Sequence, residues 1–307
     1  MNKTLNDIRK ATNVQNASHS HKSKKLNLVT TEKSNDFSCV IKELINNADC
    51  ILIGAGSGLS TAAGIDYAGK EFKKEFAPFI KKYGFTDLYS SSFYNYHTQE
   101  EYWGAWAKHI YFANTGRKGT DLYKKIFDLV KNKEYFVITT NVDDQFYKTG
   151  FDKDKIFRVQ GSYALNQCSK GCHNKLYSNV ELVNNMLDSI DDDLKVPTEL
   201  VPICPVCGES MEPNLRKDGY FIQDDLWYKQ NDKYEKFLDE NKDKNVLLLE
   251  FGVGFNTPGI IRFPFEQMTS QNKNWKLIRF NKEDMTFYDL ENRFIGINED
   301  INKFFKT

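Results

Sequence analysis

The sequence predicts an α/β protein, in which a doubly wound, Rossmann-like parallel sheet has a smaller helical domain inserted into it. Three observations predict this fold. Five short apolar runs recur along the chain, and helical patterns separate several of them. A glycine-rich turn directly follows the first run. Two segments, one aromatic and one with paired cysteines, interrupt the alternation of strands and helices, which otherwise indicates a parallel sheet.

The apolar runs define the large domain. Residues 50–54 are apolar on both faces, as expected of a parallel strand buried between helices. Similar runs occupy residues 135–139, 155–159, 246–251 and 275–280, and residues 120–131 have a helical pattern. We therefore assign residues 36–67, 120–162 and 215–307 to a Rossmann-like, nucleotide-binding domain.

The remaining segments differ in composition. Residues 1–35 are polar and are expected to form an N-terminal arm. Residues 68–119 are rich in aromatic side chains and helix-like, and residues 163–214 carry the paired cysteines. We expect these two insertions to form one small domain, with a ligand cleft between it and the carboxyl ends of the strands.

Composition restricts the class of protein. The chain has 307 residues, of which 40% are hydrophobic, as in globular proteins. Lys plus Arg and Asp plus Glu both number 42, so the net charge is zero, whereas a general nucleic-acid binder should be basic. No apolar run reaches the roughly 20 residues of a membrane helix, and the N-terminus lacks the apolar stretch of a secretory signal. We expect a cytoplasmic protein that binds neither nucleic acid nor membranes.

The turn after the first strand reads Gly54-Ala-Gly-Ser-Gly-Leu59 and continues to Gly64. Glycines allow close approach of the backbone to a pyrophosphate, and the following helix offers free N–H groups. It departs from a dehydrogenase fingerprint, because Leu59 takes the place of the last glycine and no acidic residue ends a second strand about 20 residues on. The alternative is a glycine-rich turn between a strand and a helix that does not bind phosphate.

Polar residues and glycines follow three other strands. Asn141 and Asp143 follow residues 135–139, and their amide and carboxylate groups suit ribose hydroxyls and an amide NH₂. Gly252 and Gly254 follow residues 246–251, and Asn281 ends the last run. Plain turns and caps are the alternative for each of them.

Four of the six cysteines form two close pairs, Cys168 with Cys172 and Cys204 with Cys207. Two pairs on separate turns supply the four thiolates of a structural zinc site. The first pair has three intervening residues rather than two, and 31 residues separate the pairs. His173 is an alternative ligand to Cys172, and unliganded or redox cysteines are the alternative to metal.

Taken in order, these motifs resemble the sirtuin family over roughly residues 38–285. Gly54-Ala-Gly-Ser57 and Gly64-Ile-Asp-Tyr67 are similar to its G-A-G and G-I-P-D-F-R motif, and residues 139–143 to its T-Q-N-I-D. Arg158-Val-Gln-Gly161 stands in the place of its H-G, Gly252-Val-Gly254 in that of its G-T-S, and residues 277–281 in that of its L-I-N. The resemblance implies NAD as co-substrate, a structural zinc, and cleavage of the nicotinamide–ribose bond.

The resemblance also implies roles for individual residues. The NAD contacts would be Gly54, Ala55, Gly56, Ser57, Asp66, Tyr67, Gly252, Gly254 and Asn281. The catalytic centre would be Asn141, Asp143 and Gln160, and the zinc ligands would be Cys168, Cys172, Cys204 and Cys207.

Several positions depart from the family pattern. The F-R of the first motif is Tyr67-Ala68, the Gln of T-Q-N is Thr140, and the peptide-holding F-G-E is Phe221-Ile-Gln-Asp-Asp225. The catalytic histidine is Gln160. These departures resemble the macrodomain-linked class M sirtuins of microbial pathogens. That branch implies protein ADP-ribosyltransferase activity and a protein substrate resembling the lipoyl-carrying H protein of glycine cleavage.

The chemistry of Gln160 agrees with this expectation. Deacylation needs a base with a pKa near neutrality, which His supplies and an amide does not. A protein carboxylate is already ionised near pH 7 and needs no base to attack the anomeric carbon. We therefore predict an NAD-dependent protein ADP-ribosyltransferase. The alternatives are an NAD hydrolase, a non-catalytic NAD or ADP-ribose sensor, and a weak deacylase.

Overall fold

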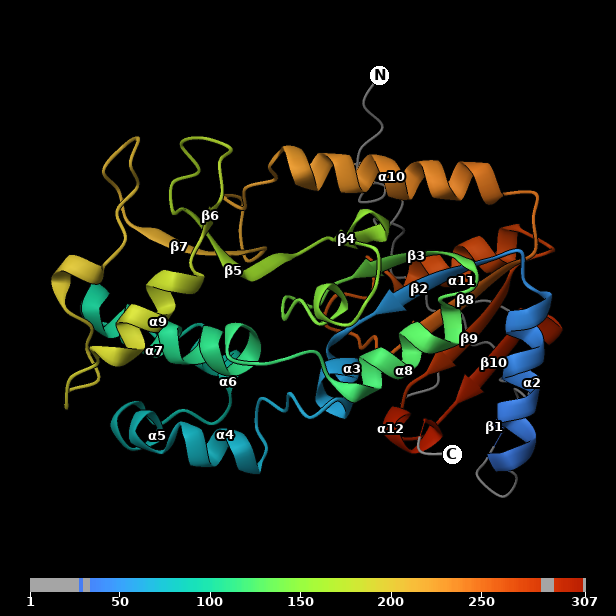
Figure 1. Cartoon of the computed structure of the whole chain (residues 1–307), viewed down its shortest axis with the longest axis horizontal. Coiled ribbons are helices and arrows are strands. Elements are labelled where there is room, and N and C mark those ends of the chain that lie inside the picture. Colours follow the sequence, from blue (N-terminus) through green and yellow to red (C-terminus); the bar gives the residue numbers. More distant parts are fainter. Residues whose placement is uncertain (1–27, 30–33, 283–289, 306–307) are drawn as a thin grey trace, which may run out of the picture.

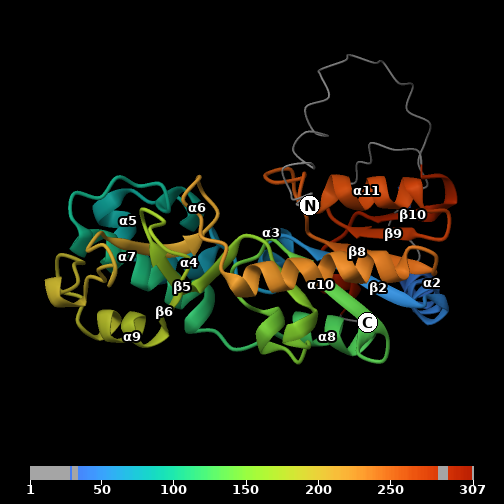
Figure 2. The ribbon, with the colours of Figure 1, turned by 90° about the horizontal axis from the view of Figure 1, so that it is seen from above.

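A computed structural model describes residues 28–29, 34–282 and 290–305 of the chain. Two parts lie side by side in Figure 1, a large sheet with helices on both faces and a smaller unit of helices around a second sheet. Figure 2 shows from above that helices α4–α7 and α9 gather at one end of the molecule and the large sheet at the other. The predicted fold class is confirmed.

The large sheet has seven parallel strands in the order β1-β10-β9-β8-β2-β3-β4. Its strands are β1 (Leu28–Val29), β2 (Cys50–Ala55), β3 (Glu134–Thr139), β4 (Ile156–Arg158), β8 (Val246–Phe251), β9 (Lys276–Phe280) and β10 (Phe294–Ile297). From β2 the chain adds β3 and β4 on one side, then returns to add β8, β9 and β10 on the other. The order therefore switches between β2 and β8, where ligands bind in folds of this kind.

Helices cover both faces of this sheet because its central strands are apolar on both sides. Along β2, Ile51, Ile53 and Ala55 face one apolar core, while Cys50 and Leu52 face another. The first core is covered by α2 (Ser34–Asn47), α3 (Ser57–Ala62), α8 (Asp121–Val130) and α12 (Ile301–Phe304). The second is covered by α10 (Asp225–Asn241) and α11 (Arg262–Gln271). Short 3₁₀ turns lie at Phe146–Lys148, Lys153–Lys155, Thr198–Leu200 and Glu291–Arg293.

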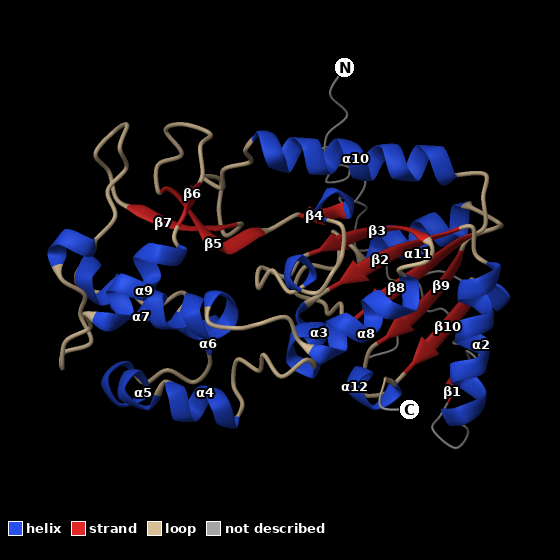
Figure 3. Cartoon of the chain, viewed as in Figure 1, coloured by secondary structure: helices blue, strands red, loops and turns tan. Residues whose placement is uncertain are grey.

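The smaller unit has its own aromatic core. Its helices are α4 (Lys70–Glu75), α5 (Ala77–Tyr83), α6 (Leu88–Ser91), α7 (Gln99–Ile110) with a π-helical end at Tyr111–Thr115, and α9 (Val180–Asp188). They enclose Phe72, Phe76, Trp103 and Trp106. The antiparallel sheet β6-β5-β7 consists of β5 (Gly161–Cys168), β6 (Tyr177–Ser178) and β7 (Met211–Leu215) and packs on this core (Figure 3).

Most predicted elements are confirmed within two residues of their ends. The five apolar runs are β2, β3, β4, β8 and β9, and the predicted helix at residues 120–131 is α8. The short strands β1 and β10 and the antiparallel sheet had not been predicted. The predicted N-terminal arm lies outside the described residues except for residues 28–29 and 34–35, and the domain boundaries remain a prediction. Among the described helices, none is both long and apolar enough to cross a bilayer.

Candidate active site

Two glycine turns meet at the point where the strand order switches. The Gly56 N–H donates to the Phe251 carbonyl at 3.0 Å, and the Gly58 N–H donates to the Gly252 carbonyl at 2.9 Å. A Cβ on Gly56 would lie 2.8 Å from that same Gly252 oxygen, and one on Gly252, whose φ is +60°, would lie 2.3 Å from the Leu59 nitrogen. Backbone packing therefore requires glycine at these positions. The N–H groups of Gly56 and Gly58, which were candidates for binding a phosphate, are therefore already hydrogen-bonded to backbone carbonyls.

The other predicted glycines have different surroundings. A Cβ on Gly54 would lie 2.5 Å from a methyl carbon of Ile261, so packing under α11 accounts for that glycine. No atom of the described residues lies within 4 Å of the position that a Cβ on Gly254 would take. Asn281 donates from Nδ2 to the Val253 carbonyl at 2.7 Å, which fixes the turn between Gly252 and Gly254. Gly254 is thus the glycine of this turn with room for a ligand.

Asn141 is buried where β3 ends and faces the first glycine turn. Its Nδ2 donates to the Gly56 carbonyl at 2.9 Å and to the Tyr123 hydroxyl at 3.1 Å, which uses both amide hydrogens. No protein donor bonds its Oδ1 among the residues that the structure describes. The free oxygen is an acceptor, so it can receive a hydrogen bond from a hydroxyl group such as those of a ribose.

Asp143 is joined to the same polar group. Its Oδ2 accepts from the Ser60 hydroxyl at 2.5 Å, its Oδ1 accepts from the Gln145 N–H at 3.0 Å, and Ser60 lies 3.3 Å from the Tyr123 hydroxyl. Burial raises the pKa of Asp143 from its ordinary value of 3.8 to about 6, although both hydrogen bonds act in the opposite direction. The carboxylate therefore changes charge close to neutral pH.

Asp66 and Tyr67 lie in the loop after α3. Asp66 accepts from the Ala68 N–H at 3.0 Å and so shapes the loop itself. The Tyr67 hydroxyl donates to the Tyr163 hydroxyl at 3.1 Å, and Tyr163 lies 3.0 Å from Nε2 of the buried His109. Burial, with Tyr163 and Asp143 as nearby groups, holds the pKa of Tyr67 well above its ordinary value. Tyr67 thus stays neutral, and its hydroxyl is directed toward the small unit. Ser57 begins α3 and Ala55 ends β2, between the glycines described above.

Gln160 lies in the turn that leads from β4 to β5. Thr139 on β3 pairs with Arg158 on the neighbouring parallel strand β4. Asn141 lies two residues after Thr139, and Gln160 lies two residues after Arg158, so both follow the carboxyl ends of adjacent strands. The Gln160 carbonyl accepts from the Arg216 N–H at 3.2 Å, and within the described chain its side chain makes no hydrogen bond to protein. The structure thus brings Asn141, Asp143 and Gln160 to one edge of the sheet. Their catalytic roles remain predictions.

The four predicted cysteine ligands form one cluster. Their sulfur atoms all lie within 4.8 Å of one another, and the Sγ–Sγ distances are 3.6 Å for Cys168 with Cys207 and for Cys172 with Cys204. Tetrahedral zinc with Zn–S bonds of about 2.3 Å requires sulfur separations of about 3.8 Å. The cluster is consistent with structural zinc. His173 Nδ1 lies 3.0 Å from the Cys172 sulfur and its Nε2 lies 3.0 Å from the Tyr177 hydroxyl, so His173 adjoins the four thiols.

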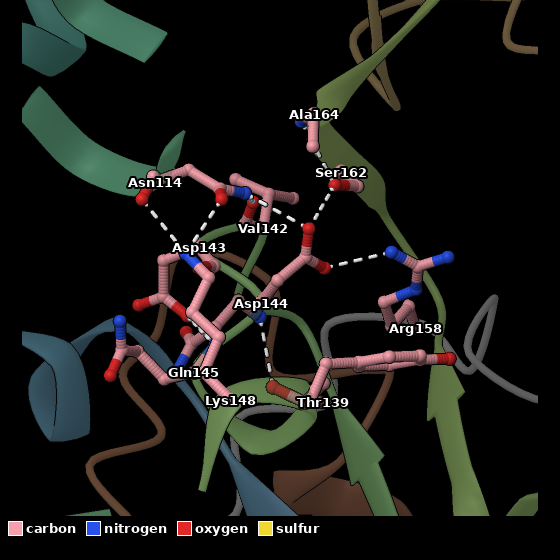
Figure 4. A network of polar contacts seen from close by, with 12 residues as sticks. Asn114, Thr139, Val142, Asp143, Asp144, Gln145, Lys148, Arg158, Ser162 and Ala164 are labelled. Carbon is pink, nitrogen blue, oxygen red and sulfur yellow. Dashed lines mark hydrogen bonds and ion pairs between the residues drawn. The ribbon is translucent and has the colours of Figure 1, made fainter. Parts of the chain in front are cut away.

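Several residues of the site were missed from the sequence. Ser60 and Tyr123 link Asp143 with Asn141, and Asp144 forms an ion pair with Arg158 and bonds to Ser162 (Figure 4). Asp144 could have been considered from the sequence, because it directly follows the predicted site residue Asp143. Ser60 and Tyr123 had none, because they are 63 residues apart and meet only through the packing of α3 against α8.

The fold and the cysteine cluster together define a class of protein, the sirtuin fold. A structure of Sir2Tm bound to a propionylated peptide matches with a TM-score of 0.55 at 17% identity, covering 90% of this chain and 96% of that one. A complex of a Sir2 homologue with NAD matches with a TM-score of 0.56 at 15% identity, covering 94% and 95%. At these identities the likeness shows the fold alone. No protein-family model matches the chain.

The sequence of a relative gives the family. The chain is 34% identical over 284 residues to a protein ADP-ribosyltransferase of Staphylococcus aureus, covering 92% of this chain and 90% of that protein. It is 31% identical over 249 residues to a probable bifunctional ADP-ribose hydrolase/ADP-ribosyltransferase of Fusarium oxysporum, covering 78% of this chain and 41% of that protein. The chain belongs to the protein ADP-ribosyltransferases of the sirtuin family. The resemblance predicted from the motifs is confirmed.

Proposed function

We propose that this chain transfers ADP-ribose from NAD to a side chain of a protein substrate and releases nicotinamide. The observation that carries the proposal is Gln160 at the strand end beside Asn141. An amide side chain donates and accepts hydrogen bonds but takes up no proton near neutral pH. Gln160 therefore suits the binding of a ribose hydroxyl and does not suit the proton transfer that deacylation requires.

No described histidine takes over the role of a base. His97 lies two residues before α7, where its backbone N–H donates to Glu101 Oε2 at 3.2 Å, and His173 adjoins the cysteine cluster. His109 is connected with Tyr67 through Tyr163, but burial lowers its pKa to about 3. Such an imidazole holds a proton too weakly to serve as a general base near neutral pH.

Transfer to a carboxylate needs no such base. The bond between the anomeric carbon and the nicotinamide nitrogen breaks, and its electron pair leaves with nicotinamide, which departs neutral. An ionised carboxylate of the acceptor protein forms the new carbon–oxygen bond. The free Oδ1 of Asn141 and the amide of Gln160 hold the ribose, and Asp143 holds the carboxamide of nicotinamide. Rigid hydrogen bonding of this kind stabilises the oxocarbenium-like transition state.

For the acceptor, we propose a lipoyl-carrying protein that resembles the H protein of glycine cleavage. The resemblance to the class M sirtuins supports this substrate, and the changed segment at residues 221–225 argues against an acyl-lysine peptide. Ile222 and Asp224 of that segment line a pocket together with Arg158 and Gly161, the residues that flank the turn at Gln160. An acceptor bound there would lie next to the predicted catalytic centre.

Hydrolysis of NAD is the second candidate function. Asp143 favours it, because a buried carboxylate with a pKa of about 6 is a suitable base for activating water near neutral pH. The same carboxylate is also suited to binding the nicotinamide amide. The two functions differ in the fate of the ADP-ribosyl group.

One experiment separates them. The protein is incubated with labelled NAD and a carrier protein in its lipoylated form, and the same carrier with an unmodified lysine serves as the control. Mass spectrometry of the carrier and quantification of nicotinamide and free ADP-ribose are compared. Transfer predicts one modified carrier side chain for each nicotinamide released. Nicotinamide with an equal amount of free ADP-ribose, and no labelled protein, would establish hydrolysis instead.

A further inference from the structure

The Asp144 carboxylate bridges the two sides of the turn that carries Gln160. Its Oδ1 accepts from Arg158 Nη1 at 2.7 Å, and its Oδ2 accepts from the Ser162 hydroxyl at 2.5 Å (Figure 4). Arg158 lies two residues before Gln160 and Ser162 lies two residues after it. Asp144 itself directly follows Asp143. From this bridge we infer that Asp144 is the positioning residue that holds Gln160 in place relative to Asn141 and Asp143.

The carboxylate is firmly held. The Asp144 and Arg158 side chains are only 10% and 13% exposed, so their ion pair is largely removed from water. Asn114 is a third donor, with Nδ2 at 3.0 Å from Asp144 Oδ2. The same Nδ2 donates to the Val142 carbonyl at 3.1 Å. Charge-assisted hydrogen bonds in a poorly solvated site are short and specific in geometry. They connect the segment that holds Asn141 with the turn that holds Gln160.

The backbone of Asp144 supports this assignment. Its φ is +56°, in the left-handed region that residues with a Cβ seldom adopt, although Asp enters it more readily than most. Such a conformation persists where the surrounding contacts fix it. Here the three donors on the carboxylate are those contacts.

Arg158 is also fixed on its far side. Its guanidinium carbon lies 4.4 Å from the centre of the Tyr147 ring, and its backbone N–H donates to Gln230 Oε1 at 3.2 Å. Gln230 in turn donates from Nε2 to the Tyr147 hydroxyl at 2.6 Å. Asp144 therefore bonds to an anchored side chain. The Gln160 side chain makes no hydrogen bond to the described part of the chain, so the turn is what places its backbone beside Asn141.

This inference rests on the proposed function, because Gln160 has its role there. The experiment measures nicotinamide release at increasing NAD concentrations for the unaltered protein, Asp144→Gly, Asp144→Asn, Gln160→Ala and the double variant Asp144→Gly/Gln160→Ala. Asp144→Gly accepts the backbone conformation but removes the bridge. We expect it to lower kcat by about 10- to 100-fold, the size of effect that misplacing a group by about 1 Å has, with KM for NAD unchanged. Asp144→Asn keeps part of the bridge and should lose less.

In the Gln160→Ala background, Asp144→Gly should have no further effect on kcat. The matched control is Glu101→Gln, because Glu101 is a carboxylate of similar burial, 9% exposed and 3.4 Å from Lys82 Nζ, in the small unit. We expect its kcat to be unchanged. Thermal unfolding of each variant verifies the fold, and if Asp144→Gly does not fold, Asp144→Asn takes its place in the same cycle.

Each outcome is decisive. An equal loss from Asp144→Gly with and without Gln160 means that Asp144 acts independently, and the inference fails. Normal kcat in Asp144→Gly, together with a large loss in Gln160→Ala, overturns the inference and leaves the proposed function standing. If Gln160→Ala releases nicotinamide as fast as the unaltered protein, Gln160 has no catalytic role and the inference fails. If the unaltered protein releases none, the proposed function fails and the inference fails with it.

Discussion

Asn141 Nδ2 lies 2.9 Å from the carbonyl oxygen of Gly56. This hydrogen bond connects the end of β3 with the glycine turn after β2, across a sequence separation of 85 residues. It also determines the direction of the amide. The Asn141 nitrogen donates to Gly56 and Tyr123, so the amide oxygen is left to act as an acceptor. The nitrogen therefore has a structural role and the oxygen a binding role, and mutations can test the two roles separately.

The first prediction concerns this division of roles. Asn141→Ala removes the acceptor and one of the two donors to the Gly56 carbonyl, which keeps its hydrogen bond from the Leu59 N–H. Tyr123→Phe keeps the Asn141 oxygen and removes a hydroxyl that contacts both Asn141 Nδ2 and Ser60. We expect Asn141→Ala to lower nicotinamide release at least about tenfold, which corresponds to about 1.4 kcal/mol, and Tyr123→Phe to lower it less. Steady-state rates of nicotinamide release check this. Equal losses in the two variants would show that the Asn141 oxygen has no special role.

The second prediction concerns the pH dependence of stability. The pKa of Asp143 is about 6 in the folded protein against 3.8 as its ordinary value, so folding favours the protonated form. Its stabilising contribution is therefore complete below pH 3.8 and is lost as the pH rises through about 6. Two pKa units correspond to roughly 3 kcal/mol. Urea unfolding between pH 4 and pH 7.5 should show the unaltered protein losing about this much relative to Asp143→Asn.

The comparison with Asp143→Asn has an internal control. Acid also protonates the cysteine thiolates, but this change affects both proteins equally and cancels in the difference. A difference in unfolding free energy that stays constant from pH 4 to pH 7.5 contradicts a raised pKa for Asp143.

The third prediction concerns the cysteine cluster. Cys172→Ser removes one of four thiolates and should abolish stoichiometric zinc, with a lower Tm. His173→Ala should retain one zinc per chain with affinity reduced about 10- to 100-fold, as expected for a group that orients a ligand without binding the metal. Metal analysis and competition with a chelator measure both. Full zinc content in Cys172→Ser and its loss in His173→Ala would instead make His173 the fourth ligand.

The fourth prediction separates packing from binding in one turn. Gly252→Ala places a Cβ 2.3 Å from a backbone nitrogen at a φ of +60° and should strongly lower the Tm or prevent folding. Gly254→Ala meets nothing within 4 Å, so its Tm should be unchanged. If Gly254 contacts NAD, its variant should raise KM for NAD with little change in kcat. Unaltered KM in a folded Gly254→Ala would remove Gly254 from the predicted NAD contacts.

The sequence allowed the central strands to be predicted because each is a continuous apolar run buried on both faces. Several short strands were missed. Phe294–Ile297 has four residues at the margin of the sheet, and its pairing partner Lys276–Phe280 becomes evident only in three dimensions. Tyr177–Ser178 is shorter still.

The charged residues inside two predicted strands also could not be interpreted until the pairing of the strands was known. Glu250 and Arg279 are paired positions on β8 and β9, fully buried, with Oε1 and Nε 2.7 Å apart. Glu250 is the single charge of its run and Arg279 is one of two in its run, with Lys276. Their opposite signs become meaningful only when the strands are known to be neighbours. The candidate site was predictable to the same degree. Strand-end residues could be assigned from chain order, whereas Ser60, Tyr123 and Arg158 depend on packing between distant segments.

Strand β5 restricts where the chain can accept inserted residues. Ser162 near one end bonds to Asp144, and Cys168 at the other end belongs to the cysteine cluster. Since side chains alternate between faces along a strand, one residue inserted between Asn166 and Cys168 would turn the cysteine away from its partners. Residues 189–200 follow α9 in loops and a 3₁₀ turn at Thr198–Leu200, and they lack the strand pairing that restricts β5 and β6. Libraries of single-residue insertions should therefore yield folded proteins in residues 189–200 and almost none in residues 166–168.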